Sequence, residues 1–523
     1  MGHERLIINN CDGMKINLIE YFFETVGSFP HRTAIIDGER RLSFGELDVR
    51  VRRAAKAIVD ACLCKNRPVA VFLPKSIEAA VADIAITCSG NVYMNLDVKN
   101  PAERLGNILS LIQPVAVITT SKYKSLIAPI ASENAKVIDI DEISGCGESP
   151  ESGWFLNRIG DLIDTDPYCI INTSGSTGTP KGVVLNHKSF MDFMAQTFDE
   201  YGFTEQDVIG SLSPVVFDIW SYEMCLLMGK GACLVVIPDT YSAFPVKILQ
   251  LMQQQRVSYI FWVPTIMVNI ANMGLLDQVP LPSLRLCWFA GEVFPTKQFN
   301  IWRRALPQTT FANFYGPIEI TLDCVYYTIE REIADDEPIP IGKPFRNTGI
   351  MILDENNQNI TEPNKEGELC IRGTSLAMGY YNNSEKTSAA FVQNPLNHCY
   401  PETIYRTGDV VFINDRGEMV FKGRKDSLIK HMGYRIELGE IEHVIINTLK
   451  LVKNGCVVYN HQRKEITLYY EAAGELSAAE FRRAIGTSLP KYMLPVVYHH
   501  LPELKRNTNG KIDRLYYSKL VEA

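Results

Sequence analysis

The sequence predicts an α/β protein that becomes richer in β structure after about residue 340 and ends in a small α+β unit. In the first third of the chain, short Val- and Ile-rich runs alternate with amphipathic helical patterns, which is typical of parallel sheets covered by helices. After about residue 340 strand patterns become denser, which favours antiparallel hairpins. The length of 523 residues, at roughly 150 residues per domain, indicates three to four folding units.

The first elements support the α/β prediction one by one. Ser43 and Glu46 have the spacing of a capping box, and the apolar positions that follow, from Leu47 to Ile58, predict an amphipathic helix. Residues 69–73 then predict a short buried strand and residues 76–88 a second helix. The alternation continues with further strand patterns at 115–119 and 137–140.

The later elements have a different character. Residues 422–430 are strongly charged and predict a linker before the final unit. The strands expected in the β-rich region cover residues 349–353, 367–372, 410–413 and 419–422. The final unit is expected to contain helices over 437–449 and 478–488 and strands over 455–459 and 466–470.

Composition and charge exclude several classes of protein. Hydrophobic residues make up 46% and charged residues 21%, which is ordinary for a folded protein. The net charge of −8 argues against nucleic acid as a partner. No apolar run approaches the roughly 18 residues of a membrane helix, and no secretory signal is recognisable, so we expect a cytoplasmic protein without a membrane partner. The cysteines and histidines lack zinc-site spacings, and buried free thiols are the expected alternative.

The strongest local signal is the segment TSGSTGTPKG at residues 173–182, which follows a strand pattern at 168–171. Its glycines allow backbone N–H groups to approach an anion, its hydroxyls add donors and Lys181 adds a positive charge. It is not a Walker A loop, because Pro180 stands where that motif needs glycine. The segment therefore predicts a phosphate-binding loop, and the alternative is a flexible polar surface loop.

This segment resembles the phosphate loop of the adenylate-forming superfamily, which includes acyl-CoA synthetases, luciferases and the amino-acid adenylation domains of nonribosomal peptide synthetases. Four further segments resemble motifs of the same superfamily, in the same order, so that the resemblance covers roughly residues 15–518. They are NFYGPIE at 313–319, YRTGD at 405–409, GRKDSLIKHMGYRIELGEIE at 423–442 and NTNGKIDR at 507–514.

The resemblance implies a domain organisation. Residues 1–424 are expected to form a large N-terminal domain of two α/β subdomains plus a small β subdomain. Residues 425–523 are expected to form a small, mobile α+β domain, with Asp426 as the hinge.

The resemblance also implies a reaction, in which ATP and Mg²⁺ convert an amino acid to an aminoacyl-adenylate and pyrophosphate. Such catalysis depends on positioning and charge neutralisation. Lys511 and Glu319 are the expected catalytic residues, and Glu319 is also expected to hold Mg²⁺. Asp409 is expected to bind the ribose and Tyr315 to stack on adenine. The nucleotide-binding residues implied are Thr173, Ser174, Gly175, Ser176, Thr177, Gly178, Lys181, Gly291, Asn313, Phe314, Tyr315, Gly316, Asp409 and Arg424.

One residue departs from the pattern of the superfamily. Ile318 precedes Glu319 where threonine is usual, so one hydroxyl that would contact the α-phosphate is missing. Losing a hydrogen bond to a charged group costs roughly 1.5–3 kcal/mol, which suggests weaker nucleotide handling but not an inactive enzyme.

The segment VVFDIWSYEM at 215–224 indicates the amino-acid branch of the superfamily, because Asp218 stands where the branch pairs an aspartate with the substrate ammonium. The alternative is that Asp218 caps a helix. Several implied pocket residues are bulky, so we expect a small amino acid or a short one with a polar or cationic end. Asp323 is expected to meet that end, or alternatively to face water at the rim. The implied pocket residues are Asp218, Ile219, Tyr222, Thr265, Trp288, Ala290, Phe314, Leu322 and Asp323.

Two alternatives and one partner complete these expectations. Residues 284–295 are similar to D-alanine–carrier protein ligases, although Ala290 stands where those tend to have cysteine, so such a ligase is the first alternative. A non-catalytic adenylate-binding protein is the second, against which Lys511 and Glu319 argue. The chain ends nine residues after Arg514, so we expect the acceptor to be the phosphopantetheine thiol of a separate carrier protein.

Overall fold

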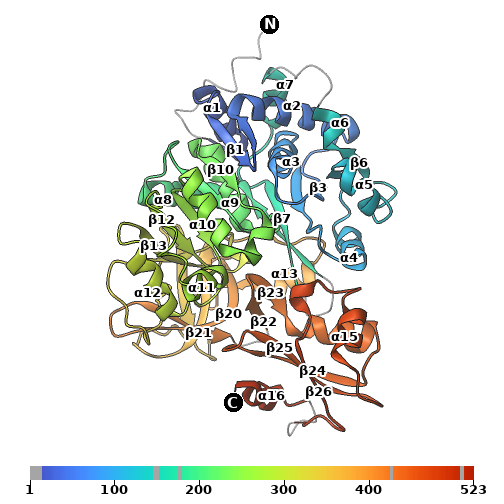
Figure 1. Ribbon diagram of the computed structural model, residues 1–523, viewed down its shortest axis with the longest axis vertical. Helices are drawn as coiled ribbons and strands as arrows, with labels where there is room; N and C mark the ends of the chain where they lie inside the picture. The colour runs from blue at the N-terminus through green and yellow to red at the C-terminus, as the bar shows by residue number, and fades with distance from the viewer. Residues whose placement is uncertain (1–14, 145–151, 175–179, 425–427, 507–511, 523) are drawn as a thin grey trace. The chain divides into compact units, whose positions relative to one another are not determined.

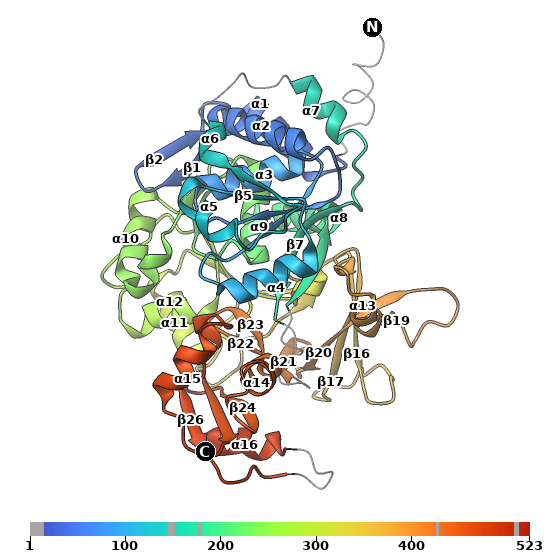
Figure 2. The same cartoon turned by 90° about the vertical axis from the view of Figure 1, so that its right-hand side faces the viewer.

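The computed structural model describes residues 15–144, 152–174, 180–424, 428–506 and 512–522. By its internal contacts the chain divides into two compact units (Figures 1 and 2). The first consists of residues 1–97, 113–171 and 183–423, and the second of 98–112, 172–182 and 424–523. The predicted domain boundary at 424/425 stays a prediction, and the second unit also takes two short segments that the sequence assigned to the large domain.

The largest sheet of the first unit has nine strands. Six neighbouring strands, from β13 to β1, are parallel, and the pairs β1–β2, β13–β14 and β14–β15 are antiparallel. The strands in spatial order are β15 (Lys343–Pro344), β14 (Val325–Thr328), β13 (Thr310–Tyr315), β12 (Leu286–Phe289), β11 (Tyr259–Trp262), β9 (Val208–Ser211), β10 (Cys233–Val236), β1 (Thr33–Asp37) and β2 (Arg40–Ser43).

A second sheet has seven strands, and the pairings recorded among β7, β4, β3, β5 and β6 are parallel, as the Val-rich runs predicted. The small β18 joins β8 antiparallel. The spatial order is β18 (Gly379–Tyr380), β8 (Lys181–Asn186), β7 (Pro167–Thr173), β4 (Val92–Asn95), β3 (Pro68–Val71), β5 (Ala116–Thr119) and β6 (Lys136–Asp139).

Helices cover these sheets. The capping box of Ser43 and Glu46 is confirmed at the start of α2, and Ser76 caps α3. The helices of the first unit are α1 (Leu18–Ser28), α2 (Phe44–Ala61), α3 (Ile77–Cys88), α5 (Ser121–Ile127), α6 (Ile140–Ser144), α7 (Ser152–Ile159), α8 (His187–Tyr201), α9 (Asp218–Lys230), α10 (Pro245–Gln255), α11 (Pro264–Asn272), α12 (Thr296–Ala305) and α13 (Ser384–Ala390), with short 3₁₀ turns η1 (Asp239–Ala243) and η2 (Ile318–Ile320).

The two faces of the nine-stranded sheet belong to two different hydrophobic cores. Along β11, Tyr259 and Phe261 pack into the core that contains α8 and α9, whereas Ile260 and Trp262 pack into the core that contains α10, α11 and α12. The side chains of β12 alternate in the same way, since Trp288 joins the first core and Phe289 the second. This is the two-residue period of a strand that is buried on both faces.

The predicted antiparallel region is confirmed as a five-stranded sheet (Figure 2). Its third strand, β20, begins seven residues earlier than the predicted 410–413. The strands are β16 (Thr348–Leu353), β17 (Gly367–Gly373), β20 (Thr403–Ile413), β19 (Phe391–Gln393) and β21 (Met419–Arg424).

The second unit is α+β, as expected, with two differences from the sequence prediction. The expected helix over 437–449 is α14 (Leu438–His443) followed by a π-helical turn, η3 (Val444–Thr448). The expected linker over 422–430 is largely strand where it is described, because β21 reaches Arg424 and β22 begins at Leu428. The remaining elements are α4 (Ala102–Ile112), β22 (Leu428–His431), β23 (Tyr434–Glu437), β24 (Asn454–Asn460), β25 (Glu465–Glu471), α15 (Ala478–Ile485), η4 (Lys491–Met493), β26 (Val497–His500) and α16 (Arg514–Glu522).

Candidate active site

Asp218 is the first residue of α9, and its carboxylate is held by a backbone group. The N-cap position belongs to Phe217, so the alternative interpretation of Asp218 as the cap is wrong. Leu322 N–H donates to Asp218 Oδ2 at 3.2 Å, and the side chain is half-buried. A carboxylate in the first helical turn is also favoured by the positive end of the helix dipole.

The turn that supplies this N–H is strained and tightly packed. Thr321 and Leu322 have φ values of 52° and 60°, in the left-handed region that side chains with a Cβ rarely adopt. Gly316 makes the turn possible, because a Cβ there would lie 2.3 Å from the Leu322 carbonyl oxygen. The predicted nucleotide-binding residue Gly316 therefore has a packing role that already requires glycine.

An aromatic layer brings together several of the predicted pocket residues. Tyr222 stacks on Trp288 with ring centroids 5.9 Å apart, and Trp288 lies 4.4 Å from Phe314. The Tyr222 hydroxyl shares a 2.7 Å hydrogen bond with Thr197. Three smaller predicted residues join the same core: Ile219, Ala290 and Leu322.

Two predicted pocket residues differ from the simplest expectation. Asp323 is 4% exposed, so the alternative in which it faces water at the rim is wrong. Thr265 lies in the first turn of α11, where its backbone N–H and its hydroxyl donate to Glu292. The next two residues of α11 belong to the core on the opposite face of the sheet from Trp288.

The structure pairs two residues for which the sequence predicts separate nucleotide contacts. The Tyr315 hydroxyl donates to Asp409 Oδ2, and both side chains are buried. Burial, with the neighbouring Asp409 charge, raises the pKa of Tyr315 well above its ordinary value, so this hydroxyl keeps its proton. The Tyr315–Asp409 pair is one preorganised unit between β13 and β20.

Glu319 lies in η2 with its side chain fully buried, and the Tyr380 hydroxyl donates to its Oε1 at 2.8 Å. Asn313, which the sequence predicts to bind the nucleotide, uses its side-chain amide to donate to the Pro340 carbonyl at 2.8 Å. Gly291 lies shortly after β12 and has a φ of 88°, in the left-handed region that favours glycine. This backbone conformation explains the glycine, and no contact with a nucleotide is needed to account for it. Tyr380 and Thr197 have no motif around them in the sequence, which is why sequence analysis missed them.

Within the second unit, the phosphate-loop segment contacts the segment 423–442. Ser174 donates its hydroxyl to the Arg435 carbonyl at 2.7 Å and accepts from Glu437 N–H at 3.0 Å. Lys181 Nζ lies 2.7 Å from Glu437 Oε1. Arg424 ends β21. The predictions for Gly175, Ser176, Thr177, Gly178, Asp426 and Lys511 lie outside the described residues.

The donor set fits a magnesium nucleotide better than a metal ion held by protein alone. In the described ranges no group of three His, Cys, Asp or Glu side chains could hold a metal ion. Mg²⁺ usually takes one or two carboxylates and completes its shell with phosphate and water, so Glu319 suits it. The buried Thr173 hydroxyl, next to the phosphate loop, has no hydrogen-bond partner among the described residues. Such a hydroxyl is available to a phosphate oxygen.

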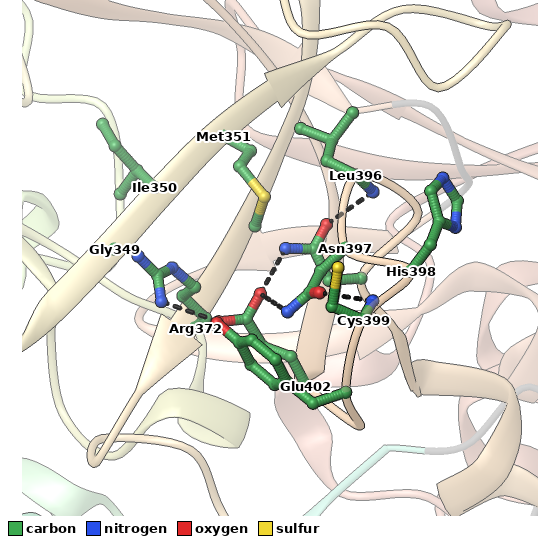
Figure 3. A pocket seen from close by; sticks show the side chains of 11 residues that line it. Gly349, Ile350, Met351, Arg372, Leu396, Asn397, His398, Cys399 and Glu402 are labelled. Carbon is green, nitrogen blue, oxygen red and sulfur yellow. Dashed lines mark hydrogen bonds and ion pairs between the residues drawn. The ribbon is translucent and has the colours of Figure 1, made fainter.

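A separate surface pocket of about 450 Å³ lies between β16, β17 and the loop after β19. None of the predicted site residues lines it. Glu402 accepts from Arg372 at 2.7 Å (Figure 3), and it also accepts from Asn394 at 2.6 Å. These polar groups stabilise the loop, so we do not place the chemistry there.

A family model described as "AMP-binding enzyme" matches residues 22–381. The chain belongs to this family. The match covers the phosphate-loop segment, α9 and the Glu319 turn. No helix in the described part of this AMP-binding enzyme has both the length and the apolar character needed to cross a membrane.

Relatives of the AMP-binding enzyme cover it almost completely. Tyrocidine synthase 1 of Brevibacillus parabrevis is 31% identical over 95% of the chain, but the chain spans 44% of that protein. L-proline–L-prolyl-carrier protein ligase of Streptomyces coelicolor is 28% identical, with 91% of each chain covered. The solved Vibrio cholerae adenylation domain AlmE, in complex with glycyl-adenosine-5′-phosphate, has the same fold, with a TM-score of 0.82 at 19% identity over 98% of this chain and 99% of that one.

Proposed function

We propose that this AMP-binding enzyme activates an amino acid with ATP and transfers the aminoacyl group to the phosphopantetheine thiol of a carrier protein. The observation that carries the proposal is Asp218, a carboxylate that accepts from Leu322 N–H at the start of the buried helix whose Tyr222 belongs to the aromatic layer. A carboxylate in apolar surroundings gains most by pairing with a cation, and the ammonium of an amino acid is such a cation. The names of two relatives, a tyrocidine synthase and a prolyl-carrier protein ligase, support it.

The other residues then have definite tasks in this reaction. The Tyr315–Asp409 pair binds the nucleoside, with the remaining acceptor capacity of Asp409 directed to the ribose. Lys181 and the Thr173 hydroxyl bind phosphate oxygens, and Glu319 holds Mg²⁺, which neutralises the charge of the leaving pyrophosphate when bound. Lys511 stabilises the α-phosphate during attack by the substrate carboxylate. We place the protein in the cytoplasm, where ATP is supplied.

The size of the substrate follows from the aromatic layer. Tyr222 of α9 packs against Trp288, Trp288 packs against Phe314, and the Tyr222 hydroxyl is hydrogen-bonded to Thr197. We therefore propose a small amino acid as the substrate. Pyrophosphate release measured with a panel that includes both enantiomers of each amino acid tests this, and a preference for D-alanine would favour the D-alanine–carrier protein ligase. Absence of release with every amino acid would contradict the proposal and leave the non-catalytic alternative.

Asp323→Asn should weaken the use of a substrate with a hydroxyl or amine at its end more than the use of glycine or alanine. The buried Asp323 carboxylate can pair with such an end, and asparagine keeps its shape but not its charge. We expect a loss in kcat/KM of about 10-fold for the polar substrate, the scale of one hydrogen bond to a charged group. Measured preference of the unmodified enzyme for a purely aliphatic amino acid would contradict this role.

Glu437→Gln should lower the KM for ATP by about 2–5-fold, the scale of a weak ion pair. Glu437 lies 2.7 Å from Lys181 and competes with phosphate for that ammonium. Glutamine keeps the length of the side chain and its acceptor oxygen but removes the competing charge. Initial rates at varied ATP measure the effect, with the KM for the amino acid as the internal control. An increase in the KM for ATP would show that Glu437 supports nucleotide binding instead.

A further inference from the structure

The helix that begins with Asp218 is buried on every side. Residues 219–228 of α9 are all buried, and apolar side chains occur all round the helix. An amphipathic helix is oriented by its single apolar face, but a helix that is apolar all round has no such face. Hydrophobic burial therefore stabilises α9 without selecting its rotation about its own axis or its position along it.

Polar contacts select the rotation of α9 about its axis and its position along it, which burial alone does not. Four consecutive residues of α9 each form a buried side-chain hydrogen bond, and successive side chains on a helix point roughly 100° apart, so the four contacts surround the helix. They are Trp220 Nε1 to Asp83 of α3 at 2.7 Å, Ser221 from Tyr93 of β4 at 2.7 Å, Tyr222 with Thr197 of α8 at 2.7 Å, and Glu223 from Ser211 of β9 at 2.5 Å.

The contact with Asp83 has an unusual arrangement of acceptors. Asp83 Oδ2 accepts from both Trp220 Nε1 and Asn95 Nδ2, at 2.7 and 2.9 Å. The second carboxyl oxygen, Asp83 Oδ1, and the amide oxygen, Asn95 Oδ1, are buried and have no hydrogen-bond partner in the described part of the chain. Asp83 and Asn95 therefore share one hydrogen bond, and each has one further oxygen atom without a partner. A proton on the Asp83 carboxyl, donated to the Asn95 amide oxygen, would explain this arrangement.

Burial favours the same protonation state. Desolvation raises the pKa of Asp83 to about 7, although the hydrogen bonds from Asn95 and Trp220 lower it. The described surroundings of the carboxyl contain no cation bonded to it. A neutral acid therefore suits this site better than a carboxylate.

We propose that Asp83, as a neutral carboxylic acid, is a positioning residue for amino-acid binding: through Trp220 it fixes α9 so that Asp218 meets the substrate ammonium. Trp220 is two residues from Asp218 on the same helix, so a rotation of α9 that broke the Asp83 contact would also displace the Asp218 carboxylate. The inference rests on the proposed function, because it takes the ammonium as the partner of Asp218.

Three substitutions test the inference through the KM for the amino acid, measured by ATP–pyrophosphate exchange. Trp220→Phe removes the N–H donor and keeps an aromatic ring, and Asp83→Leu removes both acceptors at similar size. We expect both to raise this KM by on the order of 10-fold, as a displaced binding group does, and to leave the KM for ATP unchanged. Asp83→Asn can accept from Trp220 and donate to Asn95, as the proposed neutral acid would, so we expect it to keep the KM within about 2-fold.

Trp302→Phe is the matched control. It removes another buried indole hydrogen bond, Trp302 Nε1 to the Met267 carbonyl at 2.8 Å, on α12 in the other core. We expect it to lower thermal stability as Trp220→Phe does, without changing the KM for the amino acid. If Trp220→Phe shifted the two KM values equally, or shifted neither, the positioning role would be wrong.

The remaining outcomes are equally decisive. If Asp83→Leu does not fold, the KM values of Trp220→Phe and Asp83→Asn still test the positioning role of Asp83. Impairment of Asp83→Asn as severe as that of Trp220→Phe would show that Asp83 acts as a carboxylate and overturn the proposed neutral acid. Failure of the proposed function is recognised separately: there, Asp218→Ala itself would leave amino-acid use unchanged.

Discussion

Lys511→Ala should lower ATP–pyrophosphate exchange by on the order of 10²–10³-fold, the scale of losing one preorganised charge-stabilising donor. The substrate carboxylate and the α-phosphate are both anions and must approach to bonding distance. An ammonium between them, in surroundings of low dielectric, offsets that repulsion far more strongly than a surface ion pair would. Exchange at saturating ATP and amino acid measures the loss directly.

The same variant separates the two half-reactions. Transfer from a chemically supplied aminoacyl-adenylate to a carrier thiol should survive in Lys511→Ala, because no second anion has to be brought to the phosphate in that step. Both assays use one protein preparation, so a folding defect would lower both. Equal loss in the two assays would mean that Lys511 acts throughout or is structural, and its assignment to the adenylation step alone would be withdrawn.

Asp218→Ala should abolish most activity towards amino acids, because the bound ammonium loses its counter-charge. Breaking a buried pair costs roughly 3–5 kcal/mol, and the half-buried position of Asp218 places the expected loss near 3 kcal/mol, or about 10²-fold in kcat/KM. Asp218→Asn separates charge from shape, since its oxygen can still accept from Leu322 N–H. We expect Asp218→Asn to lose nearly as much kcat/KM as Asp218→Ala, with unchanged thermal stability.

The outcome that contradicts this assignment is equally clear. Unchanged kcat/KM for the preferred substrate in Asp218→Ala would show that no ammonium meets this carboxylate. The enzyme would then act on a carboxylic acid without an amino group, and the amino-acid branch would be the wrong choice.

Periodic patterns in the sequence predicted most of the fold. The capping box at Ser43, the buried strands β3 and β5, the strand β6 and the antiparallel region after residue 340 follow from local spacing, and all are present. The main error in the fold was the helix over 437–449, which continues as a π-helical turn from Val444. A change from α to π hydrogen bonding leaves no clear mark on the apolar pattern, because the turns differ by one residue.

The candidate site was less accessible to sequence reasoning. Motifs identified Asp218, Tyr315, Glu319 and Asp409, but not that Tyr315 and Asp409 bond to one another. They also gave no signal for Tyr380, which bonds Glu319 from 61 residues away. Long-range partners of this kind follow from how strands are ordered in the sheets, and no local pattern records that order.

The alternation of side chains along β11, β12 and β13 has a consequence for how this enzyme can change. Trp288 and Phe314 belong to the core beside α9, whereas Cys287, Phe289 and Phe311 of the same two strands belong to the other core. A substitution at 288 or 314 therefore reshapes the proposed substrate layer while the opposite face keeps the sheet packed. One truncation of a large core residue costs roughly 3–5 kcal/mol, and the second core is not involved in that loss. A single substitution on this face can thus change the proposed substrate layer without removing a side chain from the second core.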